Sequence, residues 1–97
     1  MSHPSLPKVG LADLPVEVAV IIALIELNQP DYDQDGEVFS NREGRLPEQP
    51  RGYYREYTVT TPGYADRGRR RIVTGQQGEL FYSEDHSNSF VEVVLDP

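Results

Sequence analysis

The sequence predicts an α+β domain in which one N-terminal helix packs on a small antiparallel β-sheet. The first observation is a single apolar stretch at helical spacing, residues 13–27, which ends at Asn28-Gln29-Pro30. The second is a series of later runs rich in aromatic and β-branched residues, separated by turns that contain Gly and Pro. Because these runs all follow the helix and do not alternate with further helices, short turns can join them as antiparallel neighbours.

The helix should supply most of the hydrophobic core. We expect Asp13 to cap its first turn, which also contains Pro15. The apolar stripe that faces the core comprises Val18, Ile21, Ile22 and Ile25, widened by Val20, Leu24 and Leu27.

Four strands are expected after the helix, over residues 53–60, 70–74, 79–83 and 90–95. Residues 31–50 are predicted to form a loop with short extended pieces, in which Val38 and Phe39 are buried. Residues 1–10 are polar and contain proline, which favours a loose arm or an edge segment. We therefore expect a single domain that spans residues 1–97.

The charge balance argues against a broadly basic surface of the kind that binds nucleic acid. Of 97 residues, 16 are Asp or Glu and 9 are Lys or Arg, which gives a net charge of −7. The exception is the run from Arg67 to Arg71, which can form one focused cationic site. The chain has no cysteine, so a disulfide or a thiolate nucleophile is impossible. The apolar run 18–25 is too short to span a bilayer, and residues 1–10 lack the pattern of a signal peptide.

A carboxylate, two arginines and a histidine are the candidate catalytic residues. Strand alternation puts Glu56 on one face of its strand, and a turn centred near Gly63 would set it opposite Arg71. A carboxylate held there can act as a general base, although spacing alone favours an ordinary exposed ion pair. Arg67 and Arg71 can hold a phosphodiester, and His86 can donate a proton to a leaving alkoxide. Taken singly, an arginine run is more often a solvated surface, and a loop histidine more often has no chemical role.

A second candidate site is the segment from Phe39 to Glu43. Successive backbone amides can donate to the O6 atom of guanine, while a carboxylate accepts from its N1–H and exocyclic amine and an aromatic ring stacks on the base. A polar loop with one buried phenylalanine is the simpler alternative. The sequence has no phosphate-binding glycine loop, zinc-ligand spacing or complete calcium-loop pattern, so we expect neither a cofactor nor a metal.

In this order, these signals resemble the guanyl-specific microbial ribonucleases related to barnase, in particular the acidic actinobacterial branch of the RNase Sa type. The resemblance runs from about Leu14 to Phe90. Its most specific blocks are Tyr32-x-Gln34-Asp35-Gly36, Val38-Phe39-x-Asn41-Arg42-Glu43, Leu46-Pro47, Gly52-Tyr53-Tyr54-x-Glu56-Tyr57-Thr58-Val59, Thr61-Pro62-Gly63, Arg67-Gly68-x-Arg70-Arg71-Ile72, Thr74-Gly75 and Asp85-His86.

The resemblance implies catalytic roles. Glu56 matches the family's general base and His86 its general acid. Arg67 and Arg71 match the arginines that bind the phosphate. The family cleaves single-stranded RNA on the 3′ side of guanosine through a 2′,3′-cyclic phosphate, which is then hydrolysed to the 3′-phosphate.

The resemblance also assigns the guanine site. Glu43 matches the carboxylate that recognises guanine, and Phe39 matches the ring against the base. Asn41 and Arg42 match the adjoining backbone donors, and Ser40 stands between them and the ring.

This chain departs from the family pattern at several points. Ser87 replaces the tyrosine that usually follows the histidine, and Ser40 replaces a longer polar residue. Glu37 stands where an apolar residue is common. The disulfide that links the chain ends in this branch is absent. We expect a more open phosphate site as a consequence of Ser87.

The function expected from the resemblance is that of a metal-independent, guanyl-preferring endoribonuclease, secreted and acting as a monomer on single-stranded RNA without a membrane partner. A barstar-like protein inhibitor is a possible partner. Two alternatives remain open: the same fold used as a toxin domain with a dedicated inhibitor, and a catalytically weakened module that binds RNA or protein.

Overall fold

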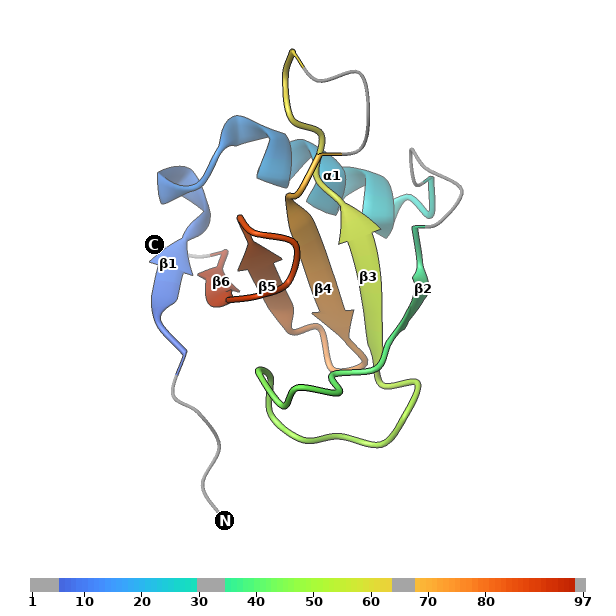
Figure 1. The fold of residues 1–97 in the computed structure, drawn as a ribbon. Coiled ribbons are helices and arrows are strands. Elements are labelled where there is room, and N and C mark those ends of the chain that lie inside the picture. Colours follow the sequence, from blue (N-terminus) through green and yellow to red (C-terminus); the bar gives the residue numbers. More distant parts are fainter. Residues whose placement is uncertain (1–5, 30–34, 64–67, 96–97) are drawn as a thin grey trace.

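The computed structural model describes residues 6–29, 35–63 and 68–95. Their elements are β1 (Lys8–Gly10), a 3-10 turn η1 (Leu11–Asp13), α1 (Val16–Glu26), β2 (Glu37–Phe39), β3 (Tyr54–Thr58), β4 (Arg71–Gly75), β5 (Leu80–Ser83) and β6 (Val91–Val94). The strands form a six-stranded sheet in the order β1-β6-β5-β4-β3-β2, with α1 packed across it (Figure 1). The predicted α+β class, with one helix on a sheet, is confirmed.

The start of the helix differs from the expectation. Asp13 was expected to be the N-cap, but it ends the 3-10 turn, which the amide of Leu14 closes by donating to Leu11 O at 3.1 Å. Pro15 takes the cap position of α1, and the cap makes no side-chain hydrogen bond. Its fixed φ, here −53°, suits the entry into a helix.

The buried face of α1 is narrower than its apolar sequence suggests. Val18, Ile21 and Ile22 are buried, whereas Val20 and Leu27 remain 54% and 65% exposed. The expectation that these two residues widen the buried stripe was therefore wrong.

Of the helices that the structure describes, none is long and apolar enough to cross a membrane.

The sheet is mixed, not purely antiparallel. Neighbouring strands from β2 through β6 pair in antiparallel fashion, but β1 pairs with β6 in parallel, with Val9 opposite Val93. The amide of Glu92 extends this pairing by donating to Pro7 O at 2.8 Å. Residues 8–10 are thus an edge strand and not a loose arm. The chain passes through α1 and four strands before β6 meets β1, so no local turn signals this pairing.

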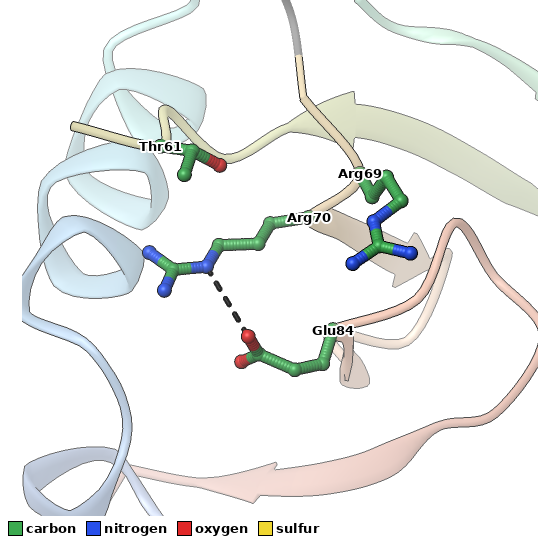
Figure 2. A pocket seen from close by; sticks show the side chains of 4 residues that line it. All are labelled: Thr61, Arg69, Arg70 and Glu84. Carbon is green, nitrogen blue, oxygen red and sulfur yellow. Dashed lines mark hydrogen bonds and ion pairs between the residues drawn. The ribbon is translucent and has the colours of Figure 1, made fainter. Parts of the chain in front are cut away.

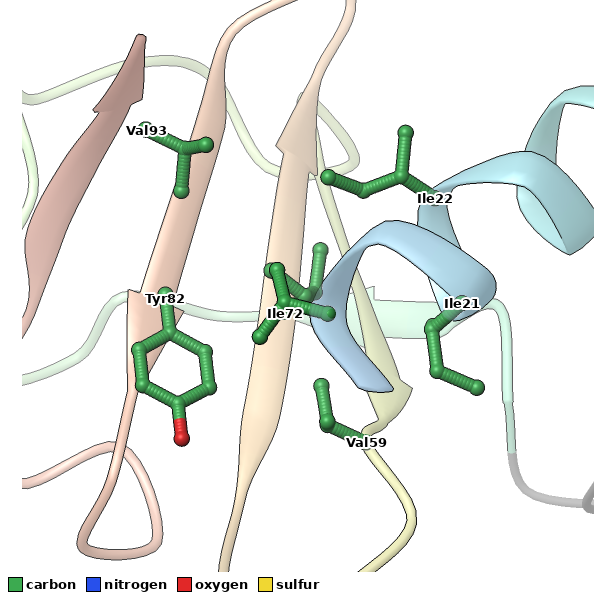
Figure 3. Close-up of a cluster of buried hydrophobic side chains, with 7 residues drawn as sticks. Ile21, Ile22, Val59, Ile72, Tyr82 and Val93 are labelled. Carbon is green, nitrogen blue, oxygen red and sulfur yellow. The ribbon is translucent and has the colours of Figure 1, made fainter. Parts of the chain in front are cut away.

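The sheet separates two hydrophobic clusters. Alternation along β4 and β5 puts Ile72 opposite Tyr82 on the helix side, and Val73 opposite Phe81 on the other side. The helix-side cluster, drawn in Figure 3, comprises Val18, Ile21, Ile22, Val59, Ile72, Tyr82 and Val93. The cluster on the other side comprises Leu46, Tyr54, Val73, Phe81 and Phe90.

The second cluster depends on loops for its cover. Leu46, from the loop between β2 and β3, is 1% exposed, and Phe90, from the loop between β5 and β6, is 5% exposed. Burial raises the pKa of Tyr54 to about 12, and its hydroxyl donates to Pro47 O at 2.7 Å. The two loops that carry the candidate site residues are therefore anchored in a hydrophobic core.

The helix-side core should dominate stability. Ile72 is fully buried, so Ile72→Ala should lower the free energy of unfolding by about 2–5 kcal/mol through lost burial and a residual cavity. Val38→Ala is the matched control, because Val38 lies on the same face of the sheet but is 38% exposed. Urea denaturation of both variants measures the difference. Equal losses would show that burial at Ile72 does not control stability.

Candidate active site

The strand register brings Glu56 and Arg71 to one face of the sheet, but not opposite each other. Glu56 of β3 pairs with Val73 of β4, and Thr58 pairs with Arg71. The expected pairing of Glu56 with Arg71 was wrong by two positions, because the connection between β3 and β4 is longer than a turn centred on Gly63 requires. The shift is an even number, so both side chains stay on the same face as diagonal neighbours.

Arg71 is a buried cation, with only 3% of its surface exposed. Its Nη1 atom donates to Arg70 O at 2.9 Å and to Gly68 O at 3.2 Å. A guanidinium held by backbone carbonyls keeps its charge and its orientation. Arg67, the other expected phosphate ligand, lies outside the described residues.

The loop between β5 and β6 is organised around the hydroxyl of Ser83. This hydroxyl is buried and donates to Asp85 Oδ1 at 2.8 Å. It accepts from the amide of Ser87 at 2.8 Å and from that of Asp85 at 3.2 Å. Asp85 in turn accepts from the amide and hydroxyl of Ser89, at 2.9 and 2.7 Å. Two side chains therefore fold the loop back on itself.

His86 and Ser87 stand at the tip of this fold, with positive φ values of 61° and 66°. Non-glycine residues rarely adopt this conformation, and two in succession need support from their surroundings. The support comes from the hydrogen bonds of Ser83 and from the amide of His86, which donates to Arg69 O at 2.7 Å. His86 is exposed, as a general acid that must meet a substrate should be.

A direct contact connects this loop to β3. Ser87 Oγ donates to Glu56 Oε2 at 2.8 Å, and both residues are half-buried. The residue after the candidate acid therefore touches the candidate base. The arrangement sets a carboxylate, a cation and a histidine-bearing loop around one face of β3 and β4.

The segment from Phe39 to Glu43 begins at the end of β2, next to this face. Asn41 has a φ of 54°. Its side chain accepts a hydrogen bond from the amide of Leu46 at 3.0 Å and donates one to Leu46 O at 2.9 Å. This pair of hydrogen bonds closes a compact loop and directs Leu46 into the core. The side chain of Asn41 is thus structural.

The tip of that loop is exposed and polar. Ser40, Arg42 and Glu43 are exposed, and within the described chain the amides of Arg42 and Glu43 donate to no other group. Glu43 Oε1 lies 3.5 Å from Arg45 Nη1 in an exposed ion pair, which is readily broken. Phe39 is half-buried and packs edge-on against Phe90 at 5.7 Å. Val38, expected to be buried, is exposed.

A second candidate site is a polar pocket beyond the end of β3 and the start of β4 (Figure 2). It is lined by Thr61, Arg69, Arg70 and Glu84. Arg70 is ion-paired with Glu84 at 3.4 Å and with Glu17 of α1 at 3.7 Å, so much of its charge is neutralised. We interpret these pairs as a structural link between the helix and the sheet.

Sequence reasoning missed the roles of Ser83 and Leu46 and the contact between Ser87 and Glu56. The spacing of Ser83 and Asp85 could have indicated a local hydrogen-bonded turn. Nothing in the sequence indicates the contact between Ser87 and Glu56, because it joins residues 31 positions apart. Among the described residues, no group of three His, Cys, Asp or Glu side chains could hold a metal ion.

A small α+β fold with these groups on one sheet face is consistent with a nuclease, and comparison with known families bears this out. A ribonuclease family model matches residues 5–94. The chain belongs to this ribonuclease family.

Particular relatives refine the assignment. The chain is 56% identical over 84 residues to guanyl-specific ribonuclease St of Saccharopolyspora erythraea, covering 86% of this chain and 83% of that protein. It is 50% identical over 84 residues to guanyl-specific ribonuclease Sa of Kitasatospora aureofaciens, which covers 84% of this chain and 88% of that protein. The fold matches ribonuclease Sa2 in complexes with mononucleotides with a TM-score of 0.91, at 48% identity over 98% of both chains. A structure of ribonuclease Sa2 with 3′-GMP matches with a TM-score of 0.88, at 44% identity over 95% of this chain and all of that one. The resemblance inferred from the sequence is confirmed.

The charge of Asp85 should stabilise the fold in a pH-dependent way. The hydrogen bond from the Ser89 hydroxyl, helped by the Ser83 hydroxyl and the amides of Ser89 and Asn88, holds the pKa of Asp85 below its ordinary value of 3.8, against an opposing effect of burial. A carboxyl whose pKa is lowered in the folded state stabilises the fold at pH values above its ordinary pKa. This stabilisation is lost as the pH falls through the folded-state pKa.

Asp85→Asn should therefore be less stable than the parent near neutral pH, and the difference should narrow as the pH falls below 3.8, the ordinary pKa of this carboxyl. Asparagine retains one acceptor oxygen but not the charge. Urea denaturation at a series of pH values measures the gap. A gap that stays constant down to the acid limit would contradict the role given to the carboxylate.

Proposed function

We propose that this protein is a guanyl-preferring endoribonuclease that cleaves single-stranded RNA on the 3′ side of guanosine. The observation that carries the proposal is the contact of the His86 loop with Glu56 beside the buried Arg71. This contact supports the proposal because it joins the loop of the proposed proton donor, His86, to the proposed acceptor, Glu56, on the sheet face that carries Arg71. The fold is that of a ribonuclease. The names of the relatives, guanyl-specific ribonucleases St and Sa, support the base preference.

In the first step, Glu56 takes the proton of the ribose 2′-hydroxyl, and the 2′-oxygen attacks the neighbouring phosphorus. The bond from phosphorus to the 5′-oxygen of the next nucleotide breaks, and His86 gives that oxygen a proton. The products are a 2′,3′-cyclic phosphate and a free 5′-hydroxyl. In the second step the roles reverse. His86 accepts a proton from water, the water oxygen attacks phosphorus, and the bond from phosphorus to the 2′-oxygen breaks. Glu56 returns its proton to that 2′-oxygen, which leaves a 3′-phosphate.

Negative charge grows on the phosphoryl oxygens as the 2′-oxygen attacks. Arg71 is fixed beside Glu56 before substrate arrives, so it can stabilise that charge without reorganisation. Arg67 is proposed as the second cation on the strength of the family resemblance alone. Proton transfers between these side chains and the substrate or water, together with cationic stabilisation, account for the chemistry without a metal ion.

Guanine is proposed to bind at the tip of the loop from Phe39 to Glu43. The amides of Arg42 and Glu43 are available as donors, in keeping with a site that offers donors to O6. The Glu43 carboxylate accepts from N1–H and the exocyclic amine, which adenine cannot supply in the same arrangement. Phe39 borders the base, and Asn41 holds the loop in shape.

The partner that follows from this proposal is single-stranded RNA. A protein inhibitor, a monomeric state and an extracellular location stay predictions from the family resemblance.

The catalytic assignment predicts that Glu56→Gln and His86→Gln each lower kcat/KM on GpC by roughly 10²- to 10⁴-fold, the usual contribution of one acid or base. Glu37→Gln is the matched control. Glu37 faces Glu56 across β2 and β3 but is exposed, and removing its charge should preserve or raise activity on an anionic substrate. Chromatography should detect the cyclic phosphate before the 3′-phosphate, with chelators present or absent. Full activity of His86→Gln, or direct release of 5′-phosphates, would contradict the assignment of Glu56 and His86 as base and acid.

The guanine assignment predicts that Glu43→Gln lowers cleavage of GpC far more than residual cleavage of ApC. An amide in place of the carboxylate leaves donors of guanine facing a donor. Arg45→Gln is the control, since it removes the ion pair of Glu43 and leaves the carboxylate in place. The ratio of kcat/KM values for GpC and ApC is the measurement. An equal loss on both substrates would mean that Glu43 supports only the fold.

A further inference from the structure

The contact between Ser87 and Glu56 has no place in the proton transfers above. Ser87 was expected to open the site, since serine is too short to act where a tyrosine would. Its hydroxyl instead turns toward the candidate base and donates to Glu56 Oε2 at 2.8 Å. A hydrogen bond to an ionised carboxylate is among the stronger kinds in proteins.

The donor is fixed before it meets the carboxylate. The amide of Ser87 donates to the buried hydroxyl of Ser83 at 2.8 Å, and its φ of 66° is held by the folded loop. A serine side chain has one rotatable bond to its oxygen. Little conformational freedom therefore remains to be lost when the hydroxyl points at Glu56.

Glu56 needs such a partner. Strand β3 fixes its backbone, but a glutamate side chain has three rotatable bonds, and the last of them is soft. Its neighbours across the two ladders are Val73, which cannot hydrogen-bond, and Glu37, which repels it. In the described parts of the chain, no side chain other than that of Ser87 hydrogen-bonds this carboxylate.

We propose that Ser87 is a positioning residue for Glu56, an inference that rests on the proposed ribonuclease function. By holding Oε2, it fixes the orientation of the carboxylate and leaves Oε1 to accept the proton of the 2′-hydroxyl. Because Ser87 follows His86 directly, the same contact also sets the separation of base and acid. The serine thus couples the two proton-transfer groups, a task different from contacting the phosphate.

Two variants remove the hydroxyl in different ways. Ser87→Ala keeps a Cβ atom in the left-handed conformation. Ser87→Gly removes the strain of that conformation, which offsets part of the stability lost with the hydrogen bond to Glu56. Ser89→Ala is the control for loosening the loop, because the Ser89 hydroxyl bonds Asp85 and not Glu56.

Kinetics on GpC should separate positioning from binding. Both Ser87 variants should lower kcat about tenfold, as expected for a misaligned catalytic group, while 3′-GMP binding changes less than about twofold. Ser89→Ala should lower stability without this loss. In a Glu56→Gln background, Ser87→Gly should cost less than about a further twofold, because the group it positions is no longer a base.

The carbon-13 shift of the Glu56 carboxyl supplies a readout that does not depend on turnover. It should move in both Ser87 variants and stay unchanged in Ser89→Ala. An unchanged shift, an undiminished kcat in Ser87→Gly, or an equal loss with and without Glu56 would each overturn the inference. Failure of the parent protein to cleave GpC would instead mark the failure of the proposed function.

Discussion

The hydroxyl of Ser83 is the interaction on which the site depends. It lies at the end of β5, almost fully buried and opposite Arg71 in the sheet register. From there it bonds Asp85 and the amides of Asp85 and Ser87. A fixed point in the sheet interior thereby determines the path of an exposed loop. The positive φ values of His86 and Ser87 persist because this buried hydroxyl stabilises them.

The helix-side core and the candidate catalytic residues lie on opposite faces of the sheet. One face packs against α1 and carries no candidate catalytic side chain, whereas the other is covered by the loops that follow β2 and β5. Each loop is anchored in the second cluster, through Leu46 in one case and Phe90 in the other. The exposed candidate recognition and catalytic groups can therefore be held in place without a second layer of helices. The cost is that the site shares its hydrophobic support with the fold, so changes at Leu46 or Phe90 act on both.

Local patterns in the sequence predicted the local structure. Helical spacing located α1, and the β-rich runs located β3 to β6 within about two residues, the usual uncertainty at the ends of elements. An edge segment was one of the two alternatives for residues 1–10, but the parallel pairing of β1 with β6 escaped prediction because it joins residues at opposite ends of the chain. The register of Glu56 was misplaced because the length of a connection cannot be deduced from one Pro-Gly turn. The exposure of Val20 and Val38 depends on where neighbouring elements end, which the apolar pattern does not contain.

The candidate site was predictable as a set of residues but not as an arrangement. Each residue alone had a simpler structural interpretation, and only their order along the chain, through the family resemblance, made Glu56, Arg71, His86 and Glu43 a set. The contact of Ser87 with Glu56 required the loop path itself. Substitution of one loop residue can thus provide a new polar contact that neither spacing nor family pattern indicates.

We propose that one face of β3 and β4, together with the loops that follow β2 and β5, forms a single guanosine phosphate site. Titration of the nitrogen-15-labelled protein with 3′-GMP shows whether base and phosphate bind at one site. We expect the largest amide shifts at Arg42 and Glu43 for the base, and at Glu56 and Arg71 for the phosphate, all with one dissociation constant. Shifts concentrated at Thr61 and Glu84, or different dissociation constants for the two groups, would contradict a single site.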